Sequence, residues 1–272
     1  MIYVMTAVHD RKSITEKFVN SLLRQTYPEI RLVLVDDGST DGTAKMVKQK
    51  MPDAVIIQGD GNLWWGGALH EAYKWICANG DRQAYALFSN DDVELPEDYI
   101  ERGIEILKSH PKTLLTGYAI SKETGERMDG AENYDFVTGV PEPSEPYGNC
   151  ASTRSLFFRV EDFLTIGGFH PKALPHYGSD YEWTIRAHEK FGYSIYCDPS
   201  LRYLSSQEST GNNFYVSMTR AKVFSKRSVS NPFYKFSYIW LVTPPRLRFA
   251  AYAQQIRRYA SKRKMIMDIM KK

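Results

Sequence analysis

The stretch Tyr85-Ala-Leu-Phe-Ser-Asn-Asp-Asp-Val93 decides the fold. Its apolar residues would lie on both faces of a strand, which is typical of a strand buried within a parallel sheet. Asn90, Asp91 and Asp92 follow at the carboxyl end of that strand, where open α/β sheets place their ligand sites. Carboxylates there can hold a hard cation such as Mg²⁺ together with substrate phosphate oxygens. A capped turn before the next helix is the alternative, and this stretch alone leaves both interpretations open.

The wider sequence predicts a doubly wound, mostly parallel α/β sheet, because strands and helices alternate through its first half. The expected strands are 2–8, 31–35, 54–58, 84–88, 113–120, 155–160 and 193–197, and the expected helices are 43–50, 68–78, 97–109 and 180–191. A capping box, Ser13-Ile-Thr-Glu16, is expected to begin a further helix after the first strand. We expect hairpins and loops over 121–149 and a polar, mobile loop over 205–213.

The length of 272 residues allows one large domain with an appendage. We expect a domain over 1–215, with halves 1–95 and 96–215, and a helical extension over 216–272. Cysteines are few and scattered, which indicates a reducing compartment. No leader peptide or apolar run of bilayer length is evident, so we expect a cytoplasmic protein.

Charge is concentrated in the tail. Residues 246–272 carry +8, whereas residues 1–245 carry −5. The tail also has an apolar helical stripe, formed by Phe249, Tyr252, Ile256, Tyr259, Ile266 and Met270. This pattern fits a helix lying on an anionic membrane, and it fits equally a helix packed on the protein body. Nucleic acid is not expected as a partner, since the basic residues do not extend into the body.

Val35-Asp-Asp-Gly-Ser-Thr-Asp-Gly42, at the end of the second expected strand, is the first site candidate. The carboxylates of Asp36 and Asp37 can accept hydrogen bonds from a base or a ribose, and the glycines permit close approach. An Asp-Gly turn before a helix is the alternative. A dinucleotide-binding fold is disfavoured, because no Gly-x-Gly-x-x-Gly follows the first strand.

Gly59-Asp-Gly-Asn-Leu-Trp-Trp-Gly-Gly67 is the second candidate. Glycines that open a helix expose backbone N–H groups to an anion such as a diphosphate. Trp64 and Trp65 could stack on a base or a sugar ring, and packing in the core or a lid is the alternative.

His176-Tyr-Gly-Ser-Asp-Tyr-Glu-Trp183 is the third candidate. Asp180 and Glu182 are two residues apart, so they do not share a helix face. One of them could act as a general base toward a hydroxyl. Both could instead complement the dipole of the helix that begins here. His176 is a candidate substrate contact, although a single histidine is more often structural.

These three stretches, in this order over roughly residues 1–210, resemble the family-2 glycosyltransferases with the GT-A fold. Val35–Thr43 looks like the nucleotide-base motif, and Asn90-Asp-Asp92 looks like the Asp-x-Asp motif with Asn in the first place. Gly178–Arg186 looks like the late Glu-Asp motif, in which Asp180 falls on the base. The loop 61–67 and the Asn-Asp-Asp form resemble the rhamnosyl- and galactofuranosyltransferase branch.

The resemblance implies an inverting, metal-assisted hexosyltransferase. It would move a sugar from a nucleotide-diphosphate donor, with dTDP-rhamnose one candidate, to a glycan or lipid-linked acceptor in cell-surface polysaccharide synthesis. Mg²⁺ or Mn²⁺ would be held by Asp92, and Asp180 would be the base, with Glu182 next. Donor contacts would come from Thr6, Asp36, Asp37, Asn62, Trp64, Trp65, Gly66, Asn90 and Asp91, and acceptor contacts from His176 and Trp183. A tail that touches the inner face of a membrane would bring the enzyme to a lipid-linked acceptor.

The sequence departs from the family at three places. Asn90 is a weaker metal ligand than Asp, and Ser179 replaces the Glu usual before the base. Ser205-Ser-Gln-Glu208 stands where many relatives carry a metal-facing His. A non-catalytic nucleotide-sugar or carbohydrate binder therefore remains an alternative. A nucleotidyltransferase is a weaker one, since Thr6–Arg11 lacks the glycine-rich loop that such enzymes need.

Overall fold

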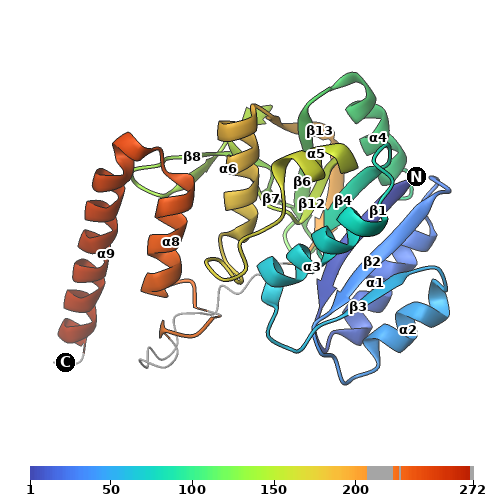
Figure 1. Cartoon of the computed structure of the whole chain (residues 1–272), viewed down its shortest axis with the longest axis horizontal. Coiled ribbons are helices and arrows are strands. Elements are labelled where there is room, and N and C mark those ends of the chain that lie inside the picture. The colour runs from blue at the N-terminus through green and yellow to red at the C-terminus, as the bar shows by residue number, and fades with distance from the viewer. Residues whose placement is uncertain (207–222, 227, 270–272) are drawn as a thin grey trace.

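A computed structural model describes residues 1–206, 223–226 and 228–269. Within them, a ten-stranded mixed sheet runs in the order β10-β13-β6-β12-β4-β1-β2-β3, with β5 beside β13 and β7 beside β6 (Figure 1). Its strands are β1 (Ile2–Val8), β2 (Ile30–Asp36), β3 (Val55–Gln58), β4 (Tyr85–Ser89), β5 (Val93–Glu94), β6 (Thr113–Ser121), β7 (Arg127–Asp129), β10 (Tyr147–Gly148), β12 (Ser155–Arg159) and β13 (Ser194–Ser205). A separate three-stranded antiparallel sheet contains β8 (Ala131–Tyr134), β9 (Pro141–Pro143) and β11 (Cys150–Ala151). The mostly parallel α/β sheet that the sequence predicts is confirmed.

Strand direction explains where the candidate site lies. Strands β1, β2, β3 and β4 are mutually parallel, so their carboxyl ends meet at one edge of the sheet. Strand β12 runs antiparallel between β4 and β6, with Ser155 opposite Ser89. An antiparallel strand begins where its neighbour ends. The start of β12 therefore joins the carboxyl ends of the parallel strands.

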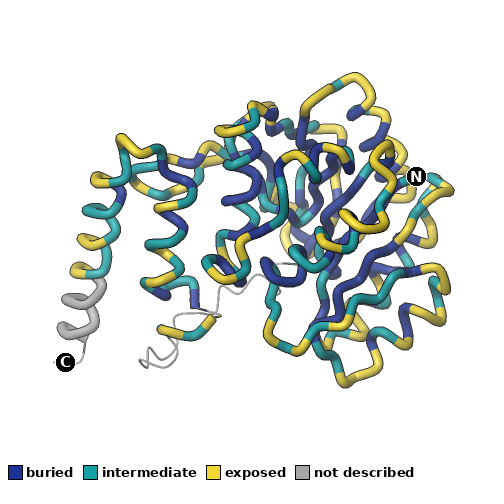
Figure 2. The backbone as a smooth tube through the Cα atoms, viewed as in Figure 1, coloured by how far each residue is buried: buried dark blue, intermediate teal, exposed yellow. Residues whose placement is uncertain are grey.

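Helices cover both faces of the sheet. They are α1 (Lys12–Leu23), α2 (Thr43–Lys50), α3 (Trp64–Asn79), α4 (Tyr99–Ser109), α5 (Val160–Ile166) and α6 (Ser179–Phe191). Alternate β1 side chains point to opposite faces, as the two-residue period of a strand requires. Tyr3 and Met5 join the core beneath α3, α5 and α6, whereas Ile2 and Val4 join the core beneath α1, α2 and α4. Figure 2 shows the central strands buried between these layers.

The C-terminal part forms two further helices, α8 (Pro232–Val242) and α9 (Arg248–Ile269), joined by a 3₁₀ turn over Pro245–Leu247. Helix α8 lies beside α6, and α9 lies beside α8 on the side away from the sheet (Figure 1). The hydroxyl groups of Tyr252 and Tyr259 donate to carbonyls of Phe236 and Ser230, so one edge of the apolar stripe in α9 packs on α8. No helix in the described part of the chain is both long and apolar enough to cross a bilayer.

Two helix starts differ from the prediction. The capping box at Ser13–Glu16 does not form, since α1 begins at Lys12 with Arg11 as its N-cap. Helix α3 begins at Trp64, four residues before the predicted start, so Gly66 and Gly67 lie within its first turns. Of the loop predicted over 205–213, Ser205 belongs to β13, and residues 207–213 lie outside the described residues, as does the expected boundary at 215.

Candidate active site

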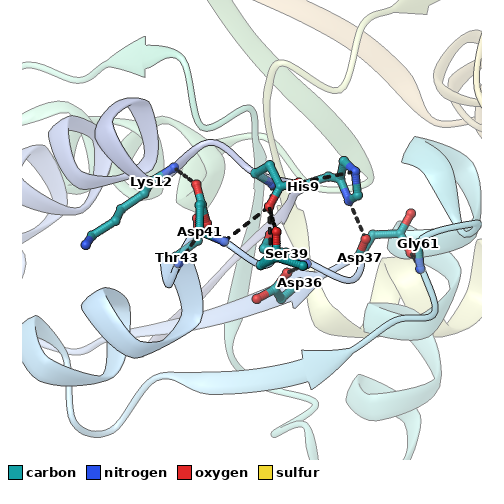
Figure 3. Close-up of polar contacts among 10 residues, drawn as sticks. His9, Lys12, Asp36, Asp37, Ser39, Asp41, Thr43 and Gly61 are labelled. Atoms are coloured by element: carbon teal, nitrogen blue, oxygen red, sulfur yellow. Dashed lines mark hydrogen bonds and ion pairs between the residues drawn. The ribbon is translucent and has the colours of Figure 1, made fainter.

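The carboxylate of Asp37, just after β2, joins the first two predicted motifs. Its two oxygens accept hydrogen bonds from the backbone N–H groups of Gly61 at 2.9 Å, Leu63 at 3.2 Å and Trp64 at 3.0 Å. These N–H groups precede or open α3, where a helix leaves its donors unsatisfied. Asp37 therefore caps α3 from a distant part of the sequence and fixes the loop against the end of β2 (Figure 3).

The turn after β2 is hydrogen-bonded to the residues after β1. His9 Nδ1 lies 2.6 Å from the Asp37 carbonyl oxygen, and the Asp10 carboxylate accepts from the Thr40 N–H at 2.7 Å (Figure 3). The Asp36 carboxylate accepts from the Ser39 N–H at 2.8 Å. Asp36 and Asp37 are both buried, so their carboxylates shape this edge of the sheet from within. No local pattern of residues marks His9 as part of this turn.

The acidic end of β4 is paired with Arg11. Arg11 Nε lies 3.0 Å from Asp91 Oδ2, and Arg11 Nη2 lies 3.2 Å from Asp92 Oδ2. Thr15 also donates to Asp91 at 2.8 Å. Burial raises the pKa of the Asp91 carboxyl, and the neighbouring Arg11 guanidinium opposes that rise. Asp91 therefore has its partners within the protein.

Asp92 keeps one oxygen for a ligand. Its Oδ1 atom is buried and has no hydrogen-bond partner. No group of three or more His, Cys, Asp or Glu is arranged to hold a metal among the described residues. Mg²⁺ commonly takes one or two carboxylates and completes its shell with substrate phosphates and water. The buried, unpartnered oxygen of Asp92 fits that role, whereas the neighbouring Asn90 contributes its backbone N–H to the carbonyl of Arg154 at 3.0 Å.

Asp180 lies in the first turn of α6. Burial raises the pKa of its carboxyl to about 6, and the negative charge of Asp129 adds to the rise. The backbone of Tyr181 and the positive charge of Arg154 act in the opposite direction. An Asp with this pKa is ionised at neutral pH and remains basic enough to accept a proton.

Asp129 and Arg154 complete the charge cluster. Arg154 Nε lies 3.8 Å from Asp129 Oδ2, which also accepts a hydrogen bond from Ser152 at 2.5 Å. Arg154 interacts electrostatically with Asp92 and Asp180 as well. One partly buried cation thus lies among three carboxylates from β7, α6 and the end of β4. Arg11, Asp129 and Arg154 were not predictable from the sequence, because no local pattern marks a residue whose partner lies far away in the chain.

Gly66 brings the start of α3 close to the segment that leads into α6. Its N–H donates to the Pro175 carbonyl at 2.9 Å, and a Cβ atom at Gly66 would lie 2.5 Å from the Leu174 carbonyl oxygen. Any side chain at this position would push apart α3 and the segment that leads into α6. Gly178, which precedes α6, adopts a φ of +82°, in the left-handed region that favours glycine.

The two tryptophans have different surroundings. The ring of Trp64 lies 5.5 Å from the ring of His176, measured between centroids, and its Nε1 has no hydrogen-bond partner. Trp65 donates from Nε1 to Thr153 at 2.9 Å and packs partly against the core. Asn62 is exposed between them and the turn after β2. Trp64 and Asn62 thus keep surface for a ligand, and Trp65 is held mainly by the protein.

Two predicted roles do not fit the structure, because Trp183 and Glu182 are buried and have partners within the protein. Trp183 is 0% exposed and donates from Nε1 to the Gly167 carbonyl, so it cannot stack on an acceptor. Thr6 is also 0% exposed, but its Oγ1 has no hydrogen-bond partner, so the donor contact predicted there stays a prediction. Glu182 is 1% exposed and pairs with Arg186 through both oxygens, at 2.8 and 3.2 Å. Glu182 therefore has a structural ion pair rather than a catalytic position.

Solved structures share this architecture at low sequence identity. The Staphylococcus aureus TarS fragment 1–349 aligns over 95% of this chain and 88% of its own, with a TM-score of 0.62 and 14% identity. The mannosyltransferase PcManGT from Pyrobaculum calidifontis, solved in complex with GDP-Man and Mn²⁺, aligns over 77% of this chain and 58% of its own, with a TM-score of 0.57 and 16% identity. Both likenesses concern the fold, which is that of GT-A glycosyltransferases.

Sequence comparison finds relatives in Bacillus subtilis (strain 168). EpsE, named as a glycosyltransferase, is 25% identical over 203 residues, which are 71% of this chain and 69% of EpsE. TuaG, named for teichuronic acid biosynthesis, is 26% identical over 133 residues, which are 47% of this chain and about half of TuaG. The family described as Glycosyl transferase family 2 matches residues 3–163. Because this match spans more than half of the sequence, the chain belongs to glycosyl transferase family 2.

Proposed function

We propose that the protein transfers a sugar from a nucleotide-diphosphate donor to a saccharide hydroxyl, with inversion at the anomeric carbon. The observation that carries the proposal is Asp180, a carboxylate with a pKa of about 6 that shares the cation Arg154 with Asp92. The acceptor oxygen bonds to the anomeric carbon as its proton passes to Asp180. The bond from that carbon to the diphosphate oxygen breaks, and its electron pair leaves with the diphosphate.

The donor occupies the edge formed by the loops after β1, β2 and β4. Asn62 is exposed there and Trp64 is half-buried, while Asp36 and Asp37 act by fixing the loops that surround this edge. The basic side chains of Arg11 and Arg154 lie close enough to the acidic cluster to offset the charge of a departing diphosphate. A Mg²⁺ or Mn²⁺ ion at Asp92 would supply further positive charge when bound.

The resemblance of the loop over 61–67 to the rhamnosyl- and galactofuranosyltransferase branch supports a rhamnosyl or galactofuranosyl donor, with dTDP-rhamnose one candidate. The name of TuaG, which refers to teichuronic acid biosynthesis, supports an acceptor in cell-surface polysaccharide synthesis, either a glycan or a lipid-linked saccharide.

A non-catalytic nucleotide-sugar binder is the second candidate. The observation that favours it is the Arg11 ion pair, which occupies Asp91 Oδ2 and Asp92 Oδ2 of the Asn90–Asp92 motif. Turnover separates the two hypotheses, since a binder would be stabilised by a donor without consuming it.

Exposed apolar side chains on α8 and α9 support the proposal that the protein contacts a membrane. Phe233, Trp240, Phe249 and Ile256 are large apolar side chains that remain 57–87% exposed on these helices. The guanidinium group of Arg248 lies over the Trp240 ring, 4.1 Å from its centroid. Exposed aromatic and aliphatic groups next to a basic tail are typical of helices that lie in an anionic membrane surface. These features support the proposal that the protein acts at the cytoplasmic face of a membrane that carries its acceptor.

Replacing the base should separate turnover from folding. Asp180→Asn is expected to lower kcat by about 10²–10⁴-fold, the usual contribution of a general base, while donor binding persists. The variant should also melt at a higher temperature at pH 8. The folded-state pKa of about 6 exceeds the ordinary 3.8, so ionisation of Asp180 destabilises the folded protein above that range. This advantage should fade as pH falls through 6 toward 4. Wild-type kcat in the variant would contradict the assignment.

The pH dependence of turnover tests the environment of the base. Wild-type kcat is expected to rise with pH through about 6 as Asp180 ionises. Asp129→Asn removes a negative charge that raises the Asp180 pKa, so the acidic limb should move to lower pH. Glu142→Gln, at an exposed position on the three-stranded sheet, is the control and should leave the limb in place. A limb that moves to higher pH in Asp129→Asn would refute this electrostatic account.

The metal ligand can be tested with a thermal-shift and hydrolysis screen of dTDP-, UDP- and GDP-sugars, with Mg²⁺, Mn²⁺ or EDTA. One donor is expected to raise the Tm in the presence of metal, and Asp92→Ala should lose that rise. Asp53→Ala, an exposed aspartate at the opposite edge of the sheet before β3, should retain it. Equal stabilisation by the donor in EDTA would show that Asp92 holds no metal.

Membrane contact can be measured by co-sedimentation with vesicles. The full chain should bind vesicles that contain phosphatidylglycerol and not vesicles of phosphatidylcholine alone. Phe249→Ser with Ile256→Ser should weaken binding by about tenfold or more, since each apolar side chain removed from a membrane surface costs about 1 kcal/mol or more. Ala250→Ser, on the exposed side of α9, is the control. Undiminished binding of the double variant would place the contact elsewhere.

A further inference from the structure

A pocket of about 240 Å³ lies between α8, the segment that leads into α6, and the three-stranded sheet. Its lining includes five tyrosines and two lysines: Tyr134, Tyr177, Tyr181, Tyr234, Tyr238, Lys226 and Lys235. Pockets of about 300–1,000 Å³ take drug-sized ligands, so this volume suits a smaller group such as one sugar residue.

The tyrosines form a wall with both apolar faces and hydroxyl groups. The rings of Tyr134 and Tyr238 meet edge to face, with centroids 5.6 Å apart. Tyr238 also lies against Gly178, where an added Cβ atom would be 3.0 Å from the ring. Rings held in this way offer apolar faces to the C–H groups of a sugar and hydroxyl groups to its oxygens. Burial raises the pKa of Tyr134 to about 12, so its hydroxyl group stays neutral and can donate.

Basic groups and carboxylates lie at different parts of the pocket. Lys226 and Lys235 belong to its lining, and Arg258 of α9 lies beside Gly139 at the same wall, close enough for its charge to act on Tyr134. The carboxylates lie toward α6, where the Tyr181 hydroxyl donates to Glu132 and the charge of Asp180 acts on Tyr181 and Tyr238. A neutral sugar would have no use for three basic groups, whereas a ligand with an anionic group would be oriented by them.

The pocket also adjoins the donor loop. Lys226 Nζ donates to the Asn62 carbonyl at 3.4 Å, and His176, which lines the pocket, contacts the ring of Trp64. Gly178, another lining residue, lies two positions before Asp180. A sugar in the pocket would therefore lie between the donor loop and the turn that carries the base. His176, which the sequence predicts to contact the acceptor, lines this pocket.

We propose that this pocket binds the acceptor, and that the acceptor sugar carries a phosphate or carboxylate group held by Lys226, Lys235 and Arg258. The tyrosines hold the ring, and its reactive hydroxyl points toward Asp180. This inference rests on the proposed transfer function and adds the chemical class of the acceptor. It also gives α8 and α9 a part in substrate recognition, since they supply Tyr234, Tyr238, Lys235 and Arg258.

The test compares three small probes on the full-length protein by saturation-transfer NMR titration: glucose, glucose 6-phosphate and glucuronate. At least one charged probe is expected to bind about tenfold more tightly than glucose, and which one does so distinguishes phosphate from carboxylate recognition. Lys235→Gln, at an exposed position, and Arg258→Gln should each reduce that preference several-fold. Tyr234→Ala should weaken binding of charged and neutral probes alike.

Lys17→Gln is the matched control, because Lys17 is an exposed lysine on α1. It should keep the wild-type preference. Equal affinity of the wild-type protein for glucose and both charged probes would overturn the inference, and so would an equal loss of preference in Lys17→Gln and Lys235→Gln. Donor stabilisation of the wild-type protein is measured in parallel. If it persists while the preference is missing, the acceptor inference alone fails, whereas its absence under every metal counts against the proposed transfer function.

Discussion

The site depends first on the carboxylate of Asp37. Its hydrogen bonds to three backbone N–H groups, at 2.9–3.2 Å, fix the start of α3 against the end of β2. Helix α3 is in turn held against the segment that leads to Asp180, because the Gly66 N–H donates to the Pro175 carbonyl. Because a buried carboxylate must satisfy its charge, it selects one geometry for this loop. Asp37, which the sequence predicts to contact the donor, thus acts by fixing the loops around the site.

A second constraint is charge balance in a partly buried cluster of charged side chains. Asp92, Asp129 and Asp180 lie near Arg154, and Arg11 compensates the end of β4. Burying a carboxylate away from water costs free energy, and attraction to Arg154 offsets only part of that cost. The pKa of Asp180 is therefore raised. Ionised Asp180 destabilises the folded protein, and for the same reason its carboxylate is basic enough to take a proton from an acceptor.

The fold was largely predictable because its signals are local. Apolar runs of five to eight residues predicted most strands of the central sheet, and helical spacing predicted most helices to within a few residues. Errors occurred where a distant group decided the outcome. Helix α3 begins at Trp64 because Asp37 caps it across 27 residues of sequence. The antiparallel direction of β12 is set by its neighbours β4 and β6, and its own residues carry no sign of it.

By itself, the sequence determined the α/β class, the order of three motifs and the family resemblance, since each depends on residues close together in the chain. The tertiary structure alone decided which side chains face a ligand. Trp183 and Glu182 follow Asp180 within one helical turn, yet both are buried against the core. Arg11 and Arg154 join the site because strand ends far apart in sequence meet at one edge of the sheet. Burial and ion pairing depend on those long-range contacts, which no local pattern of residues specifies.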